Sequence, residues 1–120
     1  MTDDEFRWNV ERDGQTARIE LAGEFDLRAY EPMSALFDMI QSDGIGHVQV
    51  DLGGVTFLDS TALGVILAAD QRARRKGERL TLTRASDRVQ RVLDIAGLSD
   101  HFEFEEPRPT QRAGGAAELL

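Results

Sequence analysis

Two hydroxyl side chains follow an aspartate where a strand pattern gives way to a helix pattern, in Asp59-Ser60-Thr61. The aspartate or the serine can simply cap the helix, since a side-chain oxygen there accepts a backbone hydrogen bond worth about 1 kcal/mol. The same position attracts anions, because free amides and the helix dipole point toward it. It also lies at the carboxyl ends of the strands, where open α/β sheets form functional crevices. Ser60 is therefore the leading candidate for chemistry, and Thr61 is the alternative hydroxyl.

Other kinds of chemistry find little support around these hydroxyls. The serine nucleophile of α/β-hydrolases lies in a Gly-x-Ser-x-Gly turn and works with a histidine base, but that motif is absent and neither His47 nor His101 has an evident route to Ser60. The two histidines are isolated, so we assign them solvated or packing roles and no metal. Gly53-Gly54 lacks the lysine and the spacing of a nucleotide-binding loop, which predicts a plain turn and no direct binding of ATP.

Four basic residues crowd the end of the helix that is predicted to begin at Ser60: Arg72, Arg74, Arg75 and Lys76. Cations at that end complement the helix dipole by about 0.3 kcal/mol each. This structural role is the favoured interpretation, and docking of an acidic partner surface is the alternative.

Apolar periodicity predicts the elements that position these side chains. Phe6, Trp8 and Val10 alternate with polar residues before a turn at Asp13-Gly14, and a second alternating run follows, so an antiparallel hairpin is expected. The later elements are a helix between Pro32 and Gly44, a strand over 45–52, a helix over 60–76, a strand at 80–82, a helix capped by Ser86 that stops at Gly97, and a short edge strand at 102–104.

The order strand, strand, helix, strand, helix, strand, helix, strand predicts an α/β fold, a mixed sheet with helices packed against it. A chain of 120 residues supports one core, so a single domain is expected over residues 1–106. Residues 107–120 contain two prolines and a run of glycine and alanine without an apolar period, which predicts a flexible C-terminal tail.

Composition argues against several classes of partner and location. The formal net charge is −8 and the basic residues form no terminal arm, so no direct contact with nucleic acid is expected. The longest apolar run, Ala62–Ala69, is far shorter than the roughly 20 residues that span a bilayer, so no membrane insertion is expected. Cysteine is absent and the acidic start lacks a signal-peptide pattern, which favours the cytoplasm.

The segment from Asp59 to Gly64 resembles the signature motif of STAS domains in the anti-sigma factor antagonist family, Asp-Ser-Ser/Thr-Gly/Ala-Leu-Gly. Val50-Asp51-Leu52 and Val55-Thr56-Phe57, which precede it, are also similar to the family, as is the upstream Leu21–Asp26. The order of elements agrees with the family as well, so the resemblance spans about residues 6–106.

The resemblance implies a regulatory protein and not an enzyme. By it, Ser60 is the phosphate acceptor, and Asp59 and Asp26 are neighbouring carboxylates. Thr61, also in the first turn, stays open as a minor acceptor. Asp26 has an equally good interpretation as the cap of a loop or of the first helix. The implied phosphosite and partner-binding environment consists of Asp26, Asp59, Ser60, Thr61, Leu63 and Gly64.

The resemblance also implies the partners. The unphosphorylated protein binds an anti-sigma factor that is a serine kinase, which releases a sigma factor, and phosphorylation at Ser60 weakens that complex. The kinase brings the ATP, so no cofactor is expected on this chain, and a serine phosphatase resets the switch. The alternative on the same fold is an accessory subunit of a lipid or anion transport system, in which the same helix face docks to a membrane complex.

A charge estimate predicts what such a phosphate changes. It carries about −1.5 to −2 units and strains a screened surface by a few kcal/mol at most, against a domain stability of about 5–15 kcal/mol. Inside an interface, an uncompensated charge costs about 2–5 kcal/mol, or roughly 30- to 4,000-fold in affinity. Partner binding, rather than folding, is therefore the property that phosphate should switch.

Overall fold

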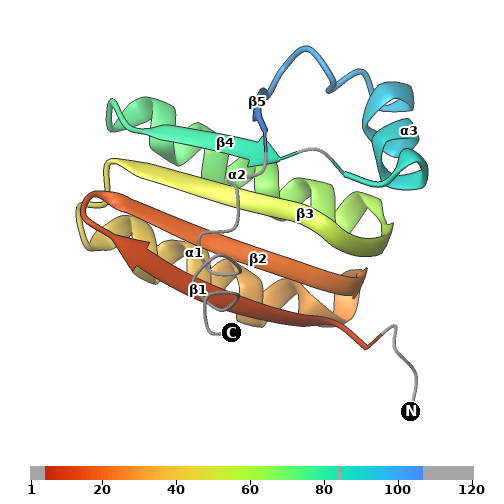
Figure 1. The fold of residues 1–120 in the computed structure, drawn as a ribbon, viewed down its shortest axis with the longest axis horizontal. Helices are drawn as coiled ribbons and strands as arrows, with labels where there is room; N and C mark the ends of the chain where they lie inside the picture. Colours follow the sequence, from red (N-terminus) through yellow and green to blue (C-terminus); the bar gives the residue numbers. More distant parts are fainter. Residues whose placement is uncertain (1–4, 84, 107–120) are drawn as a thin grey trace, which may run out of the picture.

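Strands and helices follow one another along the chain as the apolar periodicity predicts. The computed structural model describes residues 5–83 and 85–106. Within them the predicted order of elements is confirmed, and a short 3-10 helix, η1, is added before the first α-helix (Figure 1). The elements are β1 Arg7–Asp13, β2 Thr16–Phe25, η1 Leu27–Ala29, α1 Tyr30–Ser42, β3 His47–Leu58, α2 Ser60–Arg75, β4 Arg79–Thr83, α3 Asp87–Ile95 and β5 Glu103–Glu105.

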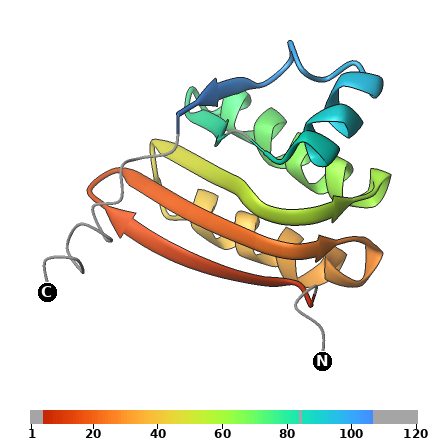
Figure 2. The same cartoon turned by 45° about the vertical axis from the view of Figure 1, so that its right-hand side comes forward.

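The strands of the described chain form one mixed sheet in the order β1-β2-β3-β4-β5. β1 runs antiparallel to β2 because a two-residue loop joins them, and the other neighbours are parallel because a helix connects each pair. The two views in Figures 1 and 2 show α1 and α2 along one face of the sheet. The α/β fold predicted from the sequence is confirmed, including β5 at one edge.

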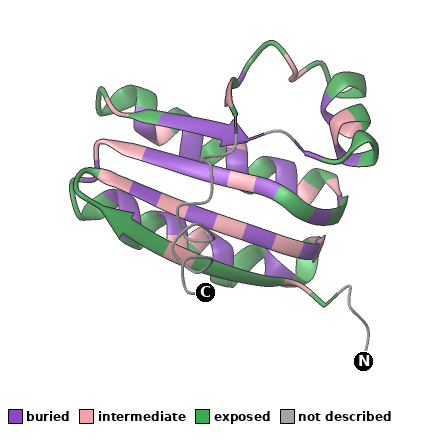
Figure 3. Ribbon diagram, viewed as in Figure 1, coloured by how far each residue is buried: buried purple, intermediate pink, exposed green. Residues whose placement is uncertain are grey.

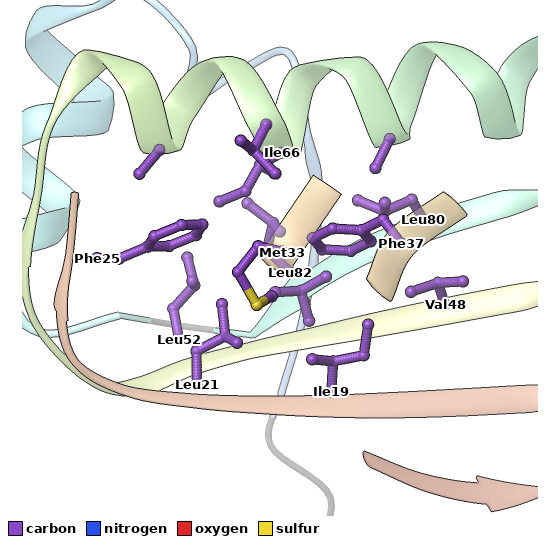
Figure 4. Packing of buried hydrophobic residues seen from close by; sticks show 14 of the residues in the cluster. Ile19, Leu21, Phe25, Met33, Phe37, Val48, Leu52, Ile66, Leu80 and Leu82 are labelled. Carbon is purple, nitrogen blue, oxygen red and sulfur yellow. The ribbon is translucent and has the colours of Figure 1, made fainter. Parts of the chain in front are cut away.

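The core lies between this face of the sheet and the helices. Every second residue of β2 from Ala17 to Phe25 is buried, which appears as stripes along the strand in Figure 3. Met33 and Phe37 of α1 are fully buried among them (Figure 4). Leu36 of the same helix is only partly buried and packs against this core.

The predicted turn at Gly53-Gly54 is wrong, because β3 continues through both glycines to Leu58. Gly54 allows β2 and β3 to approach closely, because a Cβ there would lie 2.9 Å from the Cβ of Ala22. The register between the two strands also shifts at this point, between Glu20 and Ala22. Glycine inside a strand often marks such a close approach, and it is easily mistaken for a turn in a sequence. The consequence is that β3 delivers the chain directly to Asp59.

The later elements agree with the prediction at their ends. Ser86 caps α3 by accepting a hydrogen bond from the backbone N–H of Val89 at 3.3 Å. α2 ends at Arg75, one residue before the predicted end, and Lys76 is its C-cap. The predicted C-terminal tail, residues 107–120, lies outside the described residues.

Candidate functional site

Two neighbouring parallel strands deliver two carboxylates to one edge of the sheet. β2 ends at Phe25 and β3 ends at Leu58, and these two residues are register partners. Asp26 and Asp59 follow them directly. Because the carboxyl ends of parallel strands meet at the same edge, the fold brings both aspartates to the region where α2 begins.

Asp59 links this edge to the start of α2. Its Oδ1 accepts a hydrogen bond from the backbone N–H of Ala62 at 2.9 Å, and its Oδ2 accepts one from the backbone N–H of Leu27 at 3.3 Å. Its own N–H donates to the carbonyl of Phe25 at 3.3 Å. The sequence left open whether Asp59 or Ser60 caps the helix, and the structure assigns the cap to Asp59.

Ser60 is the first residue of α2, and it is exposed. Thr61, the alternative hydroxyl, is partly buried. The amides of the first helical turn and the positive end of the helix dipole point toward this position, which favours an anion there. Of the two hydroxyls, Ser60 is therefore the more accessible to a second protein.

Asp26 caps the 3-10 helix η1 and pairs with an arginine that the sequence analysis overlooked. Its Oδ1 accepts hydrogen bonds from Arg28 N at 3.0 Å and Arg28 Nε at 3.1 Å, and its Oδ2 lies 2.7 Å from Arg28 Nη2. The side-chain hydrogen bond with Arg28 lowers the pKa of Asp26 and raises the pKa of Arg28. Arg28 Nη2 also lies 3.5 Å from Glu24 Oε1, a pair at i and i+4. Asp26 therefore has the capping role that the sequence left open.

Leu63 and Gly64, the remaining two residues of the predicted site, differ in exposure. Leu63 is buried, so its side chain packs α2 onto the core. Gly64 is exposed, and a Cβ built on it meets no atom within 4 Å. Since residues four apart share a helix face, Gly64 lies on the same side of α2 as Ser60. Packing within the described chain does not explain why this position is glycine.

Large apolar side chains are exposed at the same edge, and the sequence analysis did not identify them. Leu27, whose amide is bound by Asp59, is 66% exposed, and Phe57 near the end of β3 is 44% exposed. The signal was present for Phe57, since adjacent residues of a strand point to opposite faces and Leu58 takes the inner one. Exposed apolar groups of this size are typical of protein docking surfaces.

Three of the four basic residues at the end of α2 make local structural contacts. Arg72 Nε donates to Gln41 Oε1 at 2.8 Å, and Lys76 Nζ donates to Gln41 O at 2.5 Å. Arg74 Nε donates to Asp70 Oδ2 at 2.8 Å. These contacts join the end of α2 to α1 and to its own previous turn, which favours the structural interpretation of the cluster.

The two histidines lie apart from Ser60 in packing contacts. His47 Nε2 lies 2.8 Å from Thr81 Oγ1, and His101 Nε2 lies 3.1 Å from Asp70 Oδ2. Within residues 5–83 and 85–106, no group of three or more His, Cys, Asp or Glu side chains could hold a metal ion. No helix in those ranges is both long and apolar enough to cross a membrane.

Comparisons with known proteins confirm the family. The family model described as "Mlab, STAS domain" matches residues 8–104. An anti-sigma-B factor antagonist of Listeria monocytogenes is 35% identical over 96 residues, which cover 79% of this chain and 83% of that protein. The chain therefore belongs to the STAS domain family, and its curated relatives are anti-sigma factor antagonists, which are regulators and not enzymes.

The solved structures agree on the fold. The anti-sigma factor antagonist SpoIIAA in its unphosphorylated form has a TM-score of 0.76 at 19% identity, with 95% of this chain and 99% of that chain covered. The Bacillus cell fate determinant SpoIIAA in the phosphorylated form has a TM-score of 0.70 at 19% identity, with 95% and 100% covered. At this identity the likeness shows a common fold.

Proposed function

We propose that this chain is an anti-sigma factor antagonist whose binding to its anti-sigma factor is controlled by phosphorylation of Ser60. The unphosphorylated protein binds an anti-sigma factor that is also a serine kinase, and a sigma factor is released. The kinase supplies ATP, a serine phosphatase restores the binding form, and all of these partners meet in the cytoplasm. The function of the curated relatives supports the class of partner.

The exposure of Ser60 at the start of α2 is the observation that carries this proposal. A kinase needs an accessible hydroxyl, and the modification must leave the helix in place. Asp59 performs the capping, so phosphorylation of Ser60 removes no capping hydrogen bond. The domain is expected to stay folded while its surface gains about 1.5 to 2 negative charges.

The neighbouring charges favour repulsion over compensation. Asp59 precedes the acceptor directly, and Asp26 lies at the end of the adjacent strand. Arg28, the cation beside them, is already paired with Asp26 and Glu24. The helix amides attract the phosphate by about 0.3–2 kcal/mol, which offsets part of the repulsion between phosphate and carboxylates. Most of the negative charge of a phosphate on Ser60 would therefore stay uncompensated and would repel a docked partner.

The surface around Ser60 supports a protein partner. Leu27 and Phe57 expose apolar area at this edge, and Gly64 leaves the helix face beside Ser60 without a side chain. A partner that covers these residues would also cover Ser60 and exclude water from it. A phosphate there would then be a buried, uncompensated charge, which weakens binding by about 2–5 kcal/mol.

The test is phosphorylation of the purified protein by the kinase whose gene neighbours its own, with ATP, followed by mass spectrometry. Phosphate on Ser60, and none on a folded Ser60→Ala variant, is the expected result. Thr61→Ala serves as the matched control and should be phosphorylated normally. Phosphate that persists on Ser60→Ala would overturn the assignment.

A further inference from the structure

β1 forms one border of the sheet and is long for an edge strand. In the part of the chain that the structure describes, no strand pairs with its outer side, and β1 lies at the border in both views (Figures 1 and 2). It has seven residues and contains no proline. Natural proteins commonly protect such an edge by shortening it, twisting it, inserting proline or placing charged side chains on it, because its unpaired backbone groups bind other strands. β1 carries charges of both signs, which a second copy of the strand can match.

The loop that joins β1 to β2 fixes which backbone groups face outward. Asp13 and Thr16 flank the two-residue loop and are register partners. The residues next to such a loop exchange hydrogen bonds with each other, so every second residue of β1 counted back from Asp13 is bonded to β2. The backbone N–H and C=O groups of Trp8, Val10 and Arg12 therefore point away from β2, toward the outer side of the sheet.

We propose that β1 pairs antiparallel with β1 of a second copy of this chain, centred on Val10. In that register every opposing pair is complementary: apolar with apolar, amide with carboxylate, aromatic ring with guanidinium, and guanidinium with carboxylate. The pairs across the two-fold axis are Val10 with Val10, Asn9 with Glu11, Trp8 with Arg12, and Arg7 with Asp13. Directly opposed pairs of this kind stabilise antiparallel strands.

The charges also exclude the neighbouring registers. Centring the pair on Asn9 places Asp13 opposite Glu5, and centring it on Glu11 places two copies of Glu11 opposite each other. Like charges directly opposed destabilise a sheet. Unlike these two, the register centred on Val10 places no like charges opposite each other.

The strand is suited to self-association although the chain as a whole is acidic. β1 carries two arginines and two acidic residues, so its formal charge is zero, whereas the chain carries −8. Trp8 is 43% exposed and is available to the arginine of the second copy. Arg12 lies 2.8 Å from Asp43 at the surface, and its aliphatic part can pack on the indole while that pair persists. Because seven paired residues give an interface at the low end of specific contacts, the dimer is weak and reversible.

The dimer leaves the Ser60 region of each copy uncovered. Arg7 at the start of β1 pairs with Ala22 near the end of β2, so this end of β1 lies toward the Ser60 edge. The two-fold axis at Val10 reverses the direction of the second sheet. The two Ser60 residues therefore lie at opposite ends of a continuous ten-stranded sheet, and the inference does not depend on the proposed phosphorylation.

Sedimentation velocity of the full chain, from about 10 µM to about 1 mM, tests the dimer in the range of weak contacts. Wild type should shift from monomer to dimer as the concentration rises. Arg7→Glu and Asp13→Arg should each weaken association about ten-fold, since each alters two symmetry-related pairs, and the double variant should recover to within about three-fold of wild type. Arg91→Glu on α3 changes the net charge by the same amount and sign as Arg7→Glu, away from the edge, and should leave association unchanged.

A second pair of variants covers the case in which a change beside the turn unfolds the chain. Asn9→Lys should strengthen association, because it faces Glu11 of the other copy, and Asn9→Glu should weaken it. Circular dichroism verifies that each variant is folded. Wild type that remains monomeric throughout, or folded Asn9 variants that associate equally, would overturn the proposal, as would a double charge exchange that restores nothing.

Discussion

Removal of the Asp59 carboxylate should destabilise the domain through the loss of two hydrogen bonds, whose contributions can be measured separately. The side chain makes two hydrogen bonds to backbone amides, one from Ala62 that caps α2 and one from Leu27 that holds η1. A helix cap is worth about 1 kcal/mol, and an exposed hydrogen bond to a charged acceptor contributes about the same. Asp59→Ala should therefore lose about 2 kcal/mol, which lowers the melting temperature of a domain this size by about 10 °C.

Asp59→Asn separates the two contributions. Asparagine caps a helix about as well as aspartate, but its amide group offers one acceptor oxygen instead of two. The variant should therefore retain the bond from Ala62, lose the bond from Leu27 and unfold about midway between wild type and Asp59→Ala. Asp87→Ala is the control, since Asp87 lies in the first turn of α3 without being its cap.

Thermal unfolding followed by circular dichroism measures all three variants. Asp87→Ala should lose about 0.5 kcal/mol at most, since it gives up only an interaction with the helix dipole. An Asp59→Ala protein that melts within about 2 °C of wild type would refute the reasoning, because the two hydrogen bonds would then contribute nothing.

Three further predictions concern the same edge and the end of the chain. Gly64→Ala should raise the free energy of unfolding by up to about 1 kcal/mol while weakening partner binding. Gly54→Ala should instead lower the free energy of unfolding, because its Cβ would clash with β2. Chemical denaturation that shifts both variants in the same direction would contradict this. The Arg28 hydrogen bond lowers the pKa of Asp26, so this pair should stabilise the fold above about pH 4 and lose that effect as the pH falls further, and Asp26→Asn should flatten that part of the acid unfolding curve. Deletion of residues 108–120 should leave the melting temperature almost unchanged, and a large fall would show that the tail stabilises the domain.

The sequence predicted the order of elements because its apolar residues recur at strand and helix periods. The buried face of β2 and the Ser86 cap of α3 follow from such local signals. The path through Gly53-Gly54 did not, because Gly54 is required by its closeness to Ala22, a residue more than thirty positions away. Close approach between strands is a tertiary property, and in a sequence it has the same appearance as a turn.

In the candidate site, too, local features could be predicted from the sequence and tertiary contacts could not. The Asp59-Ser60 pair was visible as a helix start, but the choice of Asp59 as the cap depends on where its two oxygens point. The pairing of Arg28 with Asp26 depends on η1, which turns the chain so that the guanidinium reaches the carboxylate two residues earlier. The exposure of Leu27 depends on η1, the short helix between β2 and α1. Because η1 has no apolar period of its own, the sequence did not predict it.

The most direct test of the central claim compares Ser60→Asp with Ser60→Ala in two measurements, affinity for the anti-sigma factor by titration calorimetry and melting temperature. Our account predicts that Ser60→Ala binds with the affinity of the unphosphorylated protein. Ser60→Asp should bind with an affinity lower by roughly 30-fold or more, with only a small change in melting temperature. Equal affinity of the two folded variants, or a Ser60→Asp protein that loses binding because it unfolds, would contradict it.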